Sequence, residues 1–137
     1  GSLLGILDYT CTAMGARTLR GFIEQPLAVK REIDERLEAV QMLAQADMTV
    51  DMIREALMQV YDVERLLSRI AYKSINAKDC LALRDSLSHV PEIHDALASI
   101  APNGMLGCLL DQLTPLDNVV EKLTQAIDRR PLYQERI

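Results

Sequence analysis

The sequence has few aromatic residues: it contains no tryptophan and one phenylalanine, and aromatic residues make up 4% of its 137 residues. Leu, Ala, Met and Ile must therefore fill any core, which favours helices over sheets rich in aromatic and β-branched residues. Only 6 Gly and 5 Pro are present, which excludes collagen-like and Pro/Gly-rich chains. Because 49% of the residues are hydrophobic and 26% are charged, the composition is that of a globular domain.

Cysteines and long apolar runs are also scarce. Cys11, Cys80 and Cys108 are odd in number and widely spaced, which argues against a disulfide framework and fits a reducing compartment. Charged residues interrupt every window long enough to cross a bilayer, and the N-terminus lacks the features of a signal peptide. We therefore expect a cytoplasmic protein with no membrane partner. The net charge of −5 argues against a free-standing nucleic-acid-binding domain.

Apolar residues recur at helical spacing along nearly the whole chain. One stripe consists of Val29, Ile33, Leu37 and Val40, and similar stripes follow as far as Ile127. We find no alternating pattern typical of a strand. The sequence therefore predicts an all-α, multi-helix bundle of six to eight helices, in a single helical domain that spans residues 1–137.

Capping residues mark several of the predicted helix starts. Asp62 precedes one stripe and Thr49 precedes another. Asn76 is followed three residues later by Asp79, which is close to a capping box. The Thr-Pro pair at 114–115 marks the start of the last predicted helix.

The segment before Pro26 predicts a helix that contains an unusual glycine. Thr12 can cap this helix, and Phe22 contributes to its apolar face. Gly15 lies early in it, where alanine would be about 1 kcal/mol more favourable. A glycine at such a position suggests that another backbone approaches closely.

Motifs for catalysis and cofactor binding are missing. The chain has neither a GxxxxGK[ST] phosphate loop nor a GxGxxG motif. Its two histidines, His89 and His94, lie about 140° apart on a helix, unlike a metal pair on one helical face. Cys80 with His89 is the one conceivable pair of nucleophile and base, and nothing in the spacing selects it. We therefore expect no metal site, no cofactor and no enzyme activity in this chain.

Residues 62–70 carry more charge than their surroundings. Arg65 and Arg69 are four residues apart and share a face of the predicted helix, and Asp62 can reach Arg65 within one turn. Two interpretations stay open. The segment is either a capped surface helix with one local ion pair, or a helix whose arginines bridge neighbouring helices by bidentate bonds. Neither interpretation makes it an active site.

Four motifs follow one another along the chain. They are Thr12-Ala13-Met14-Gly15-x-Arg17-x-Leu19-Arg20, then Pro26-Leu27 with Ile33-x-x-Arg36-Leu37-x-x-Val40, then Tyr61-Asp62-x-Glu64-Arg65-Leu66-x-Ser68-Arg69-Ile70, then Asn76-x-x-Asp79-x-x-x-Leu83-Arg84-x-Ser86-Leu87. Their order and spacing resemble the start of the core (lever) domain of the bacterial MutS mismatch-repair family. The match runs from residue 3 to about residue 90, and the rest fits as generic amphipathic helix. Phe22 stands where this family often has Trp, and Val29 where it usually has an acid that could cap a helix.

This resemblance implies that the chain is a fragment. The family's mismatch-reading domain, its DNA clamp and its ATPase, which uses ATP and Mg²⁺, would lie outside it. The resemblance therefore implies no catalytic, cofactor or metal residue here. It implies that the chain is a helical coupler in the parent protein. The coupler would connect the domains that bind mismatched duplex DNA to the ATPase. It also implies that the parent is a homodimer in the bacterial cytoplasm.

A coupler of this kind needs stiff joints between helices or domains. Our candidates for inter-helix or interdomain bonding are arginines and acids of the first and third motifs: Arg17, Arg20, Asp62, Glu64, Arg65 and Arg69. The alternative for each of them is an ordinary solvated side chain.

A second function also fits the sequence. Six methionines in a chain with one phenylalanine could line the adaptable apolar groove of an independent adaptor that binds a partner protein. They are Met14, Met42, Met48, Met52, Met58 and Met105. Burial of these side chains inside the bundle would exclude the adaptor.

Overall fold

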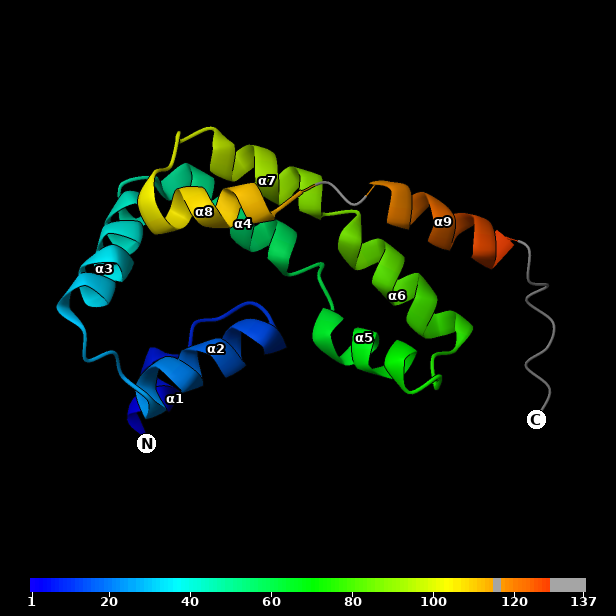
Figure 1. Cartoon of the computed structure of the whole chain (residues 1–137), viewed down its shortest axis with the longest axis horizontal. Helices are drawn as coiled ribbons and strands as arrows, with labels where there is room; N and C mark the ends of the chain where they lie inside the picture. Colours follow the sequence, from blue (N-terminus) through cyan, green and yellow to red (C-terminus); the bar gives the residue numbers. More distant parts are fainter. Residues whose placement is uncertain (115–116, 129–137) are drawn as a thin grey trace.

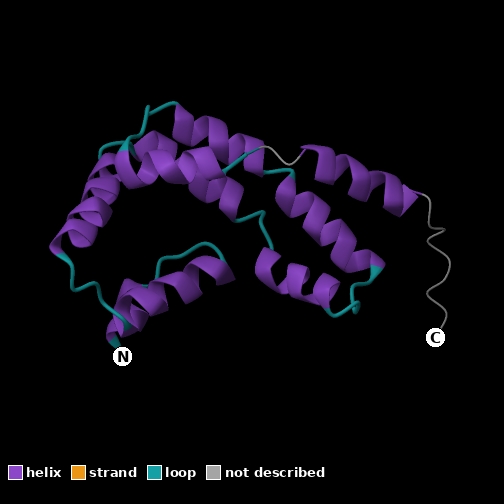
Figure 2. Cartoon of the chain, in the orientation of Figure 1, coloured by secondary structure: helices purple, strands orange, loops and turns teal. Residues whose placement is uncertain are grey.

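The structure, a computed structural model, describes residues 1–114 and 117–128, and every regular element in these residues is an α-helix (Figure 1, Figure 2). The helices are α1 (Leu3–Leu7), α2 (Ala13–Glu24), α3 (Lys30–Ala44), α4 (Asp47–Leu57), α5 (Val63–Ala71), α6 (Ala77–Leu87), α7 (Val90–Ala98), α8 (Gly104–Gln112) and α9 (Asp117–Asp128). The predicted all-α fold is confirmed. Helix α1 has only 5 residues. The other eight described helices have 9 residues or more, which agrees with the predicted six to eight helices.

Helices α3, α4, α7 and α8 pack together at the top left of Figure 1 and contain the main hydrophobic core. In this group α4 lies against α7, and α3 lies against both α4 and α8. Ala39, Leu97 and Leu106 are buried at the centre, and partly buried side chains surround them: Met42, Leu43, Ile53, Ile100, Met105, Leu110 and Leu113. Aliphatic residues and methionine fill this core, as the composition requires.

Helices α5, α6 and α9 form a second group on the right of Figure 1. The central helix α6 packs against both α5 and α9. Leu66 of α5 and Leu83 of α6 are buried. The capping box predicted from Asn76 and Asp79 is present at the start of α6.

The helices follow an arc that brings two distant parts of the chain together. α1 and α2 pair with each other at the lower left of Figure 1, and α5 returns so that its start lies near α2. Residues 25–29 connect α2 to α3 without regular structure. Val29 is the N-cap residue of α3, and its side chain makes no capping bond. No helix in the described residues is both long enough and apolar enough to cross a membrane.

The apolar stripe of α3 does not face one core along its whole length. Ile33, Leu37 and Val40 are 37%, 60% and 57% exposed, whereas Ala39 and Leu43 belong to the core of the four-helix group. The predicted helix over these residues is present, but the face that they share is not part of the core. Helical spacing shows which residues share a face, but it does not show whether that face meets another element.

Thr49 does not cap a helix, contrary to the prediction. α4 begins two residues earlier, at Asp47, with Ala46 at the N-cap position. Asp47 lies in the first turn, where the helix dipole favours a carboxylate. Thr49 is buried within the helix. In the helix start predicted at 114–115, residue 115 lies outside the described residues.

Gly15 has a different role from the one predicted. A Cβ added there would lie 3.1 Å from the Thr12 hydroxyl oxygen and 3.5 Å from the Cβ of Thr10. The close neighbours are therefore side chains around the start of α2, and not the backbone of another element. The small residue makes room for the cap of its own helix.

Candidate functional site

Two carboxylates lie together at the start of α5. Asp62 is the N-cap residue, and its Oδ1 accepts a hydrogen bond of 3.2 Å from the backbone N–H of Arg65. Glu64 lies in the first turn of the same helix. The positive end of the helix dipole favours negative charge at both positions. The local sequence therefore creates an acidic site at this helix terminus.

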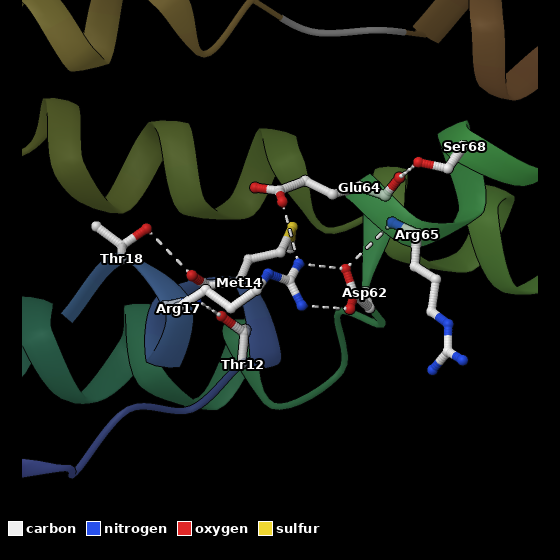
Figure 3. Close-up of polar contacts among 9 residues, drawn as sticks. Thr12, Met14, Arg17, Thr18, Asp62, Glu64, Arg65 and Ser68 are labelled. Carbon is white, nitrogen blue, oxygen red and sulfur yellow. Dashed lines mark hydrogen bonds and ion pairs between the residues drawn. The ribbon is translucent and has the colours of Figure 1, made fainter. Parts of the chain in front are cut away.

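Arg17 of α2 binds both of these carboxylates (Figure 3). Its Nη1 donates to Asp62 Oδ2 and its Nη2 donates to Asp62 Oδ1, each at 2.8 Å. Nη2 also donates to Glu64 Oε2 at 3.1 Å. The contact with Asp62 has the bidentate geometry of strong guanidinium–carboxylate pairs. The Arg17 side chain is 50% exposed and that of Asp62 is 20% exposed, so water reaches the pair mainly from the arginine side.

Local hydrogen bonds fix the turn of α2 from which Arg17 extends. The Thr12 hydroxyl oxygen caps the helix by accepting a bond of 2.9 Å from the Gly15 N–H. The Thr18 hydroxyl donates to the Met14 carbonyl at 3.1 Å (Figure 3). Because the cap sets where α2 begins, it also sets the direction in which Arg17 points.

This ion pair shifts the pKa values of both partners so that each stays charged. The hydrogen bonds from Arg17 lower the pKa of Asp62 to about 2, although partial burial acts in the opposite direction. The hydrogen bonds to Asp62, and then to Glu64, raise the pKa of Arg17 above its ordinary value. Both groups are charged at neutral pH, which suits a structural bond and does not suit proton transfer.

A second ion pair joins α5 to α6. Arg69 Nη1 donates to Asp79 Oδ1 at 2.6 Å, and Asp79 is 7% exposed. The Asn76 N–H donates to Asp79 Oδ2 at 3.3 Å, and the Asp79 N–H donates to Asn76 Oδ1 at 2.8 Å. The hydrogen bond from Arg69 lowers the pKa of Asp79. One carboxylate therefore completes the capping box of α6 and also holds α5 against α6.

Four of the six candidate residues make bonds between helices. Arg17 of α2 binds Asp62 and Glu64 at α5, and Arg69 of α5 binds Asp79 of α6. The two clusters are separate. Asp79 was predicted only as a capping residue, because its second bond depends on the packing of α5 against α6.

The other two candidate arginines make no such bond. Arg65 takes part only through its backbone N–H, and its side chain points away from the cluster in Figure 3. Arg20 is exposed and forms no ion pair with any described residue. Both residues are exposed.

A further interhelical arginine contact was missed by the sequence analysis. The guanidinium of Arg36 in α3 lies over the ring of Phe22 in α2, 3.6 Å from its centroid. The Nε of Arg36 is buried and has no hydrogen-bond partner among the described residues. Arg36 stands in one of the quoted motifs and Phe22 lies between two of them, but no spacing rule pairs an aromatic residue with an arginine on the next helix.

Each of the two histidines contacts a carboxylate close to it in the sequence. His89 Nδ1 lies 3.3 Å from Glu92 Oε2, and His94 Nδ1 lies 3.2 Å from Asp95 Oδ1. The hydrogen bonds of the described residues include none between Cys80 and His89. The part of the chain that is described contains no group of three or more His, Cys, Asp or Glu residues placed to hold a metal ion.

Comparison with known proteins shows the family. The family described as MutS domain III matches residues 1–137. This chain belongs to the MutS domain III family. The match covers the whole chain, so the part after residue 90, which the motifs alone left as generic helix, is also MutS domain III.

Three MutS proteins illustrate the similarity. The DNA mismatch repair protein MutS of Oceanobacillus iheyensis is 42% identical over 131 residues, which is 96% of this chain and 15% of that protein. MutS of Desulforamulus reducens is 50% identical over 101 residues, 74% of this chain and 12% of that protein. MutS of Staphylococcus aureus is 38% identical over 131 residues, again 96% and 15%. The matched region therefore spans 12–15% of the length of these relatives.

Proposed function

We propose that this MutS domain III chain is a helical coupler in a DNA mismatch repair protein. Other domains of the complete protein bind mismatched duplex DNA and hydrolyse ATP with Mg²⁺, and this chain transmits rigid-body shifts between them without catalysis of its own. The observation that carries the proposal is its 38–50% identity to a short part of proteins named DNA mismatch repair protein MutS. The same proposal makes the complete protein a homodimer in the bacterial cytoplasm.

The geometry of the charged clusters supports a mechanical role. Arg17–Asp62 connects α2 to α5, and Arg69–Asp79 connects α5 to α6, so consecutive ion pairs link three helices. The Arg69–Asp79 pair, whose carboxylate is only 7% exposed, holds α5 in a fixed hydrogen-bond geometry against α6 and resists rotation between these two helices. Arg17 and Asp62 both stay ionised at neutral pH, which fits a structural contact better than a reactive site.

Fluorescence anisotropy of a labelled duplex tests whether this chain itself binds DNA. A short matched or mismatched duplex is titrated with the folded 137-residue chain at low salt and at about 150 mM salt. We expect no binding at either salt, because DNA recognition belongs to other domains. Salt-sensitive binding to both duplexes would instead indicate direct DNA contact, with Arg65 and Lys73 as the exposed candidates. Specific binding of ATP by this chain would contradict the proposal.

The coupling itself is tested in the complete protein that contains this chain. Leu97→Ala leaves a cavity in the four-helix core and should soften it, because Leu97 is 5% exposed. We expect the ATPase to respond less to mismatched DNA, with the basal ATPase rate retained. Ala98→Ser, at the exposed neighbouring position of the same helix, is the control. An unchanged response in Leu97→Ala would contradict the coupler.

The adaptor remains a second candidate because three methionines are exposed. Met48, Met52 and Met58 are 81%, 52% and 63% exposed, and the first two are one turn apart on α4. The other three methionines are partly buried. A partner protein that binds the chain and is lost in the double variant Met48→Ser, Met52→Ser would favour the adaptor. Binding that survives this change would exclude this surface.

A further inference from the structure

The α1–α2 hairpin contributes nothing to the buried core. All residues of α1 and α2 are described, and none of them is buried. Among the helix pairs with extensive contact, these two helices pair only with each other. Figure 1 shows the hairpin at one end of the arc, below the four-helix group. Burial of apolar side chains therefore does little to hold this hairpin in position.

Two guanidinium groups make the specific contacts between the hairpin and the rest of the chain. Arg17 binds Asp62 and Glu64 at the start of α5, and Arg36 of α3 lies over the Phe22 ring. Arg36 is only six residues beyond the start of α3, close to the connecting segment 25–29. This contact crosses the connecting segment, so it must shift or break when the hairpin turns. The Arg17 contact spans 45 residues of sequence and fixes the orientation of the hairpin.

We propose that the α1–α2 hairpin is a detachable arm, which Arg17 latches onto the start of α5 and which turns about residues 25–29 when the latch opens. Water reaches the latch, since the Arg17 side chain is 50% exposed. Exposed ion pairs are weak and are screened by salt, so the closed and open positions differ little in free energy. Asp62 also caps α5, so the same carboxylate connects the arm to the helix that it holds.

The latch is a property of this chain and does not depend on the proposed coupling function. A chain that fails the DNA and ATPase tests above could still have a salt-sensitive arm. Conversely, if the arm proves rigid, the proposed coupling function still stands, but the opening of the Arg17 contact is not part of it.

The distance between two spin labels measures the position of the arm. Gly21→Cys on α2 and Lys78→Cys on α6 carry the labels; a Cβ at Gly21 meets open space and Lys78 is exposed. The native cysteines are replaced by serine or alanine: Cys11, Cys80 and Cys108. Circular dichroism confirms that each labelled variant of the 137-residue chain is folded.

Two substitutions open the latch, and a third provides the control. Arg17→Ala removes the guanidinium. Asp62→Asn removes the charge but keeps a side chain that can cap α5. Arg20→Ala removes an exposed arginine of the same helix that forms no ion pair with a described residue.

We expect a single main distance in the wild-type chain at low salt. In Arg17→Ala and Asp62→Asn the population with other distances should rise about two- to fivefold. Raising the salt to about 1 M should produce the same change in the wild type and little further change in the variants. Arg20→Ala should match the wild type. Identical distributions in wild type, Arg17→Ala and Asp62→Asn would overturn the proposal, as would an equal shift in Arg20→Ala.

Discussion

Asp62 makes hydrogen bonds within its own helix and across to another one. Its Oδ1 accepts from the backbone of α5 and from Arg17, while Oδ2 accepts from Arg17 alone. A carboxylate has enough lone pairs for all three bonds. Asp62 thus both caps α5 and binds Arg17 of α2, and the ionisation of its carboxylate affects both contacts.

Acid should weaken this contact in a defined pH range. The pKa of an aspartate is about 3.9 in an unfolded chain, and in the folded chain that of Asp62 is about 2. A lowered pKa stabilises the folded state above the unfolded value, and this contribution is lost as the pH falls through the folded value. We expect the difference in urea unfolding midpoint between wild type and Asp62→Asn to shrink from about pH 4 to about pH 2. A difference that stays constant over this range would contradict the assigned charge state.

Within residues 1–114 and 117–128, two residues other than glycine have a left-handed backbone, Lys73 with φ of 56° and Ala101 with φ of 46°. Ala101 follows α7, in the turn before α8. This conformation is unfavourable for a residue with a Cβ. We expect Ala101→Gly to stabilise the chain by about 0.5–1 kcal/mol. Ala82→Gly, in the middle of α6, should destabilise it by about 1 kcal/mol. Thermal unfolding followed by circular dichroism compares the two, and equal effects would contradict the backbone argument.

At the scale of the helix, α3 has two apolar surfaces with different surroundings. Ala39 and Leu43 pack in the four-helix core, while Leu37 and Val40 are exposed. Hydrophobic side chains are stabilising only where another element removes them from water. The same residue type should therefore differ in its effect from one face of the helix to the other.

Leucine-to-alanine substitutions test this difference. Leu43→Ala removes a side chain of α3 that packs against the four-helix core and should lower the free energy of unfolding by about 1–3 kcal/mol. Leu37→Ala removes a side chain that is 60% exposed and should change it by less than about 0.5 kcal/mol. Urea unfolding of the 137-residue chain measures both. A large effect of Leu37→Ala would mean that this face of α3 has a partner within the chain.

Features that depend on neighbours in the sequence could be predicted from it. The helical periods and the caps at Asp62 and Asn76 arise within one turn, so local rules identify them. The bond between Arg17 and Asp62 could not be predicted as a pair, because it depends on how α2 and α5 are placed in space. The exposed face of α3 was missed for the same reason.

At the scale of the molecule, the arc should not unfold as one unit. The four-helix group has a buried core, whereas none of the residues of α1 and α2, all of them described, is buried. Local stability follows the number of buried apolar contacts. We expect the backbone amides of α2 to exchange with deuterium faster than those of α4 and α7, as measured by hydrogen exchange of the whole chain. Equal protection in all helices would show that the hairpin is part of one cooperative unit.

The contacts of Asp79 also determine where the fold can accept inserted or deleted residues. This side chain is bound from two directions, by Arg69 at the end of α5 and by Asn76 at the start of α6. The corner between the two helices, residues 72–76, must therefore keep its length, because one inserted residue would rotate Asp79 away from Arg69. Residues 25–29 have no ion pair across them, and only the stacked contact of Arg36 on Phe22 joins the two helices that they connect, so insertions and deletions that arise in evolution should be more frequent there than in the corner.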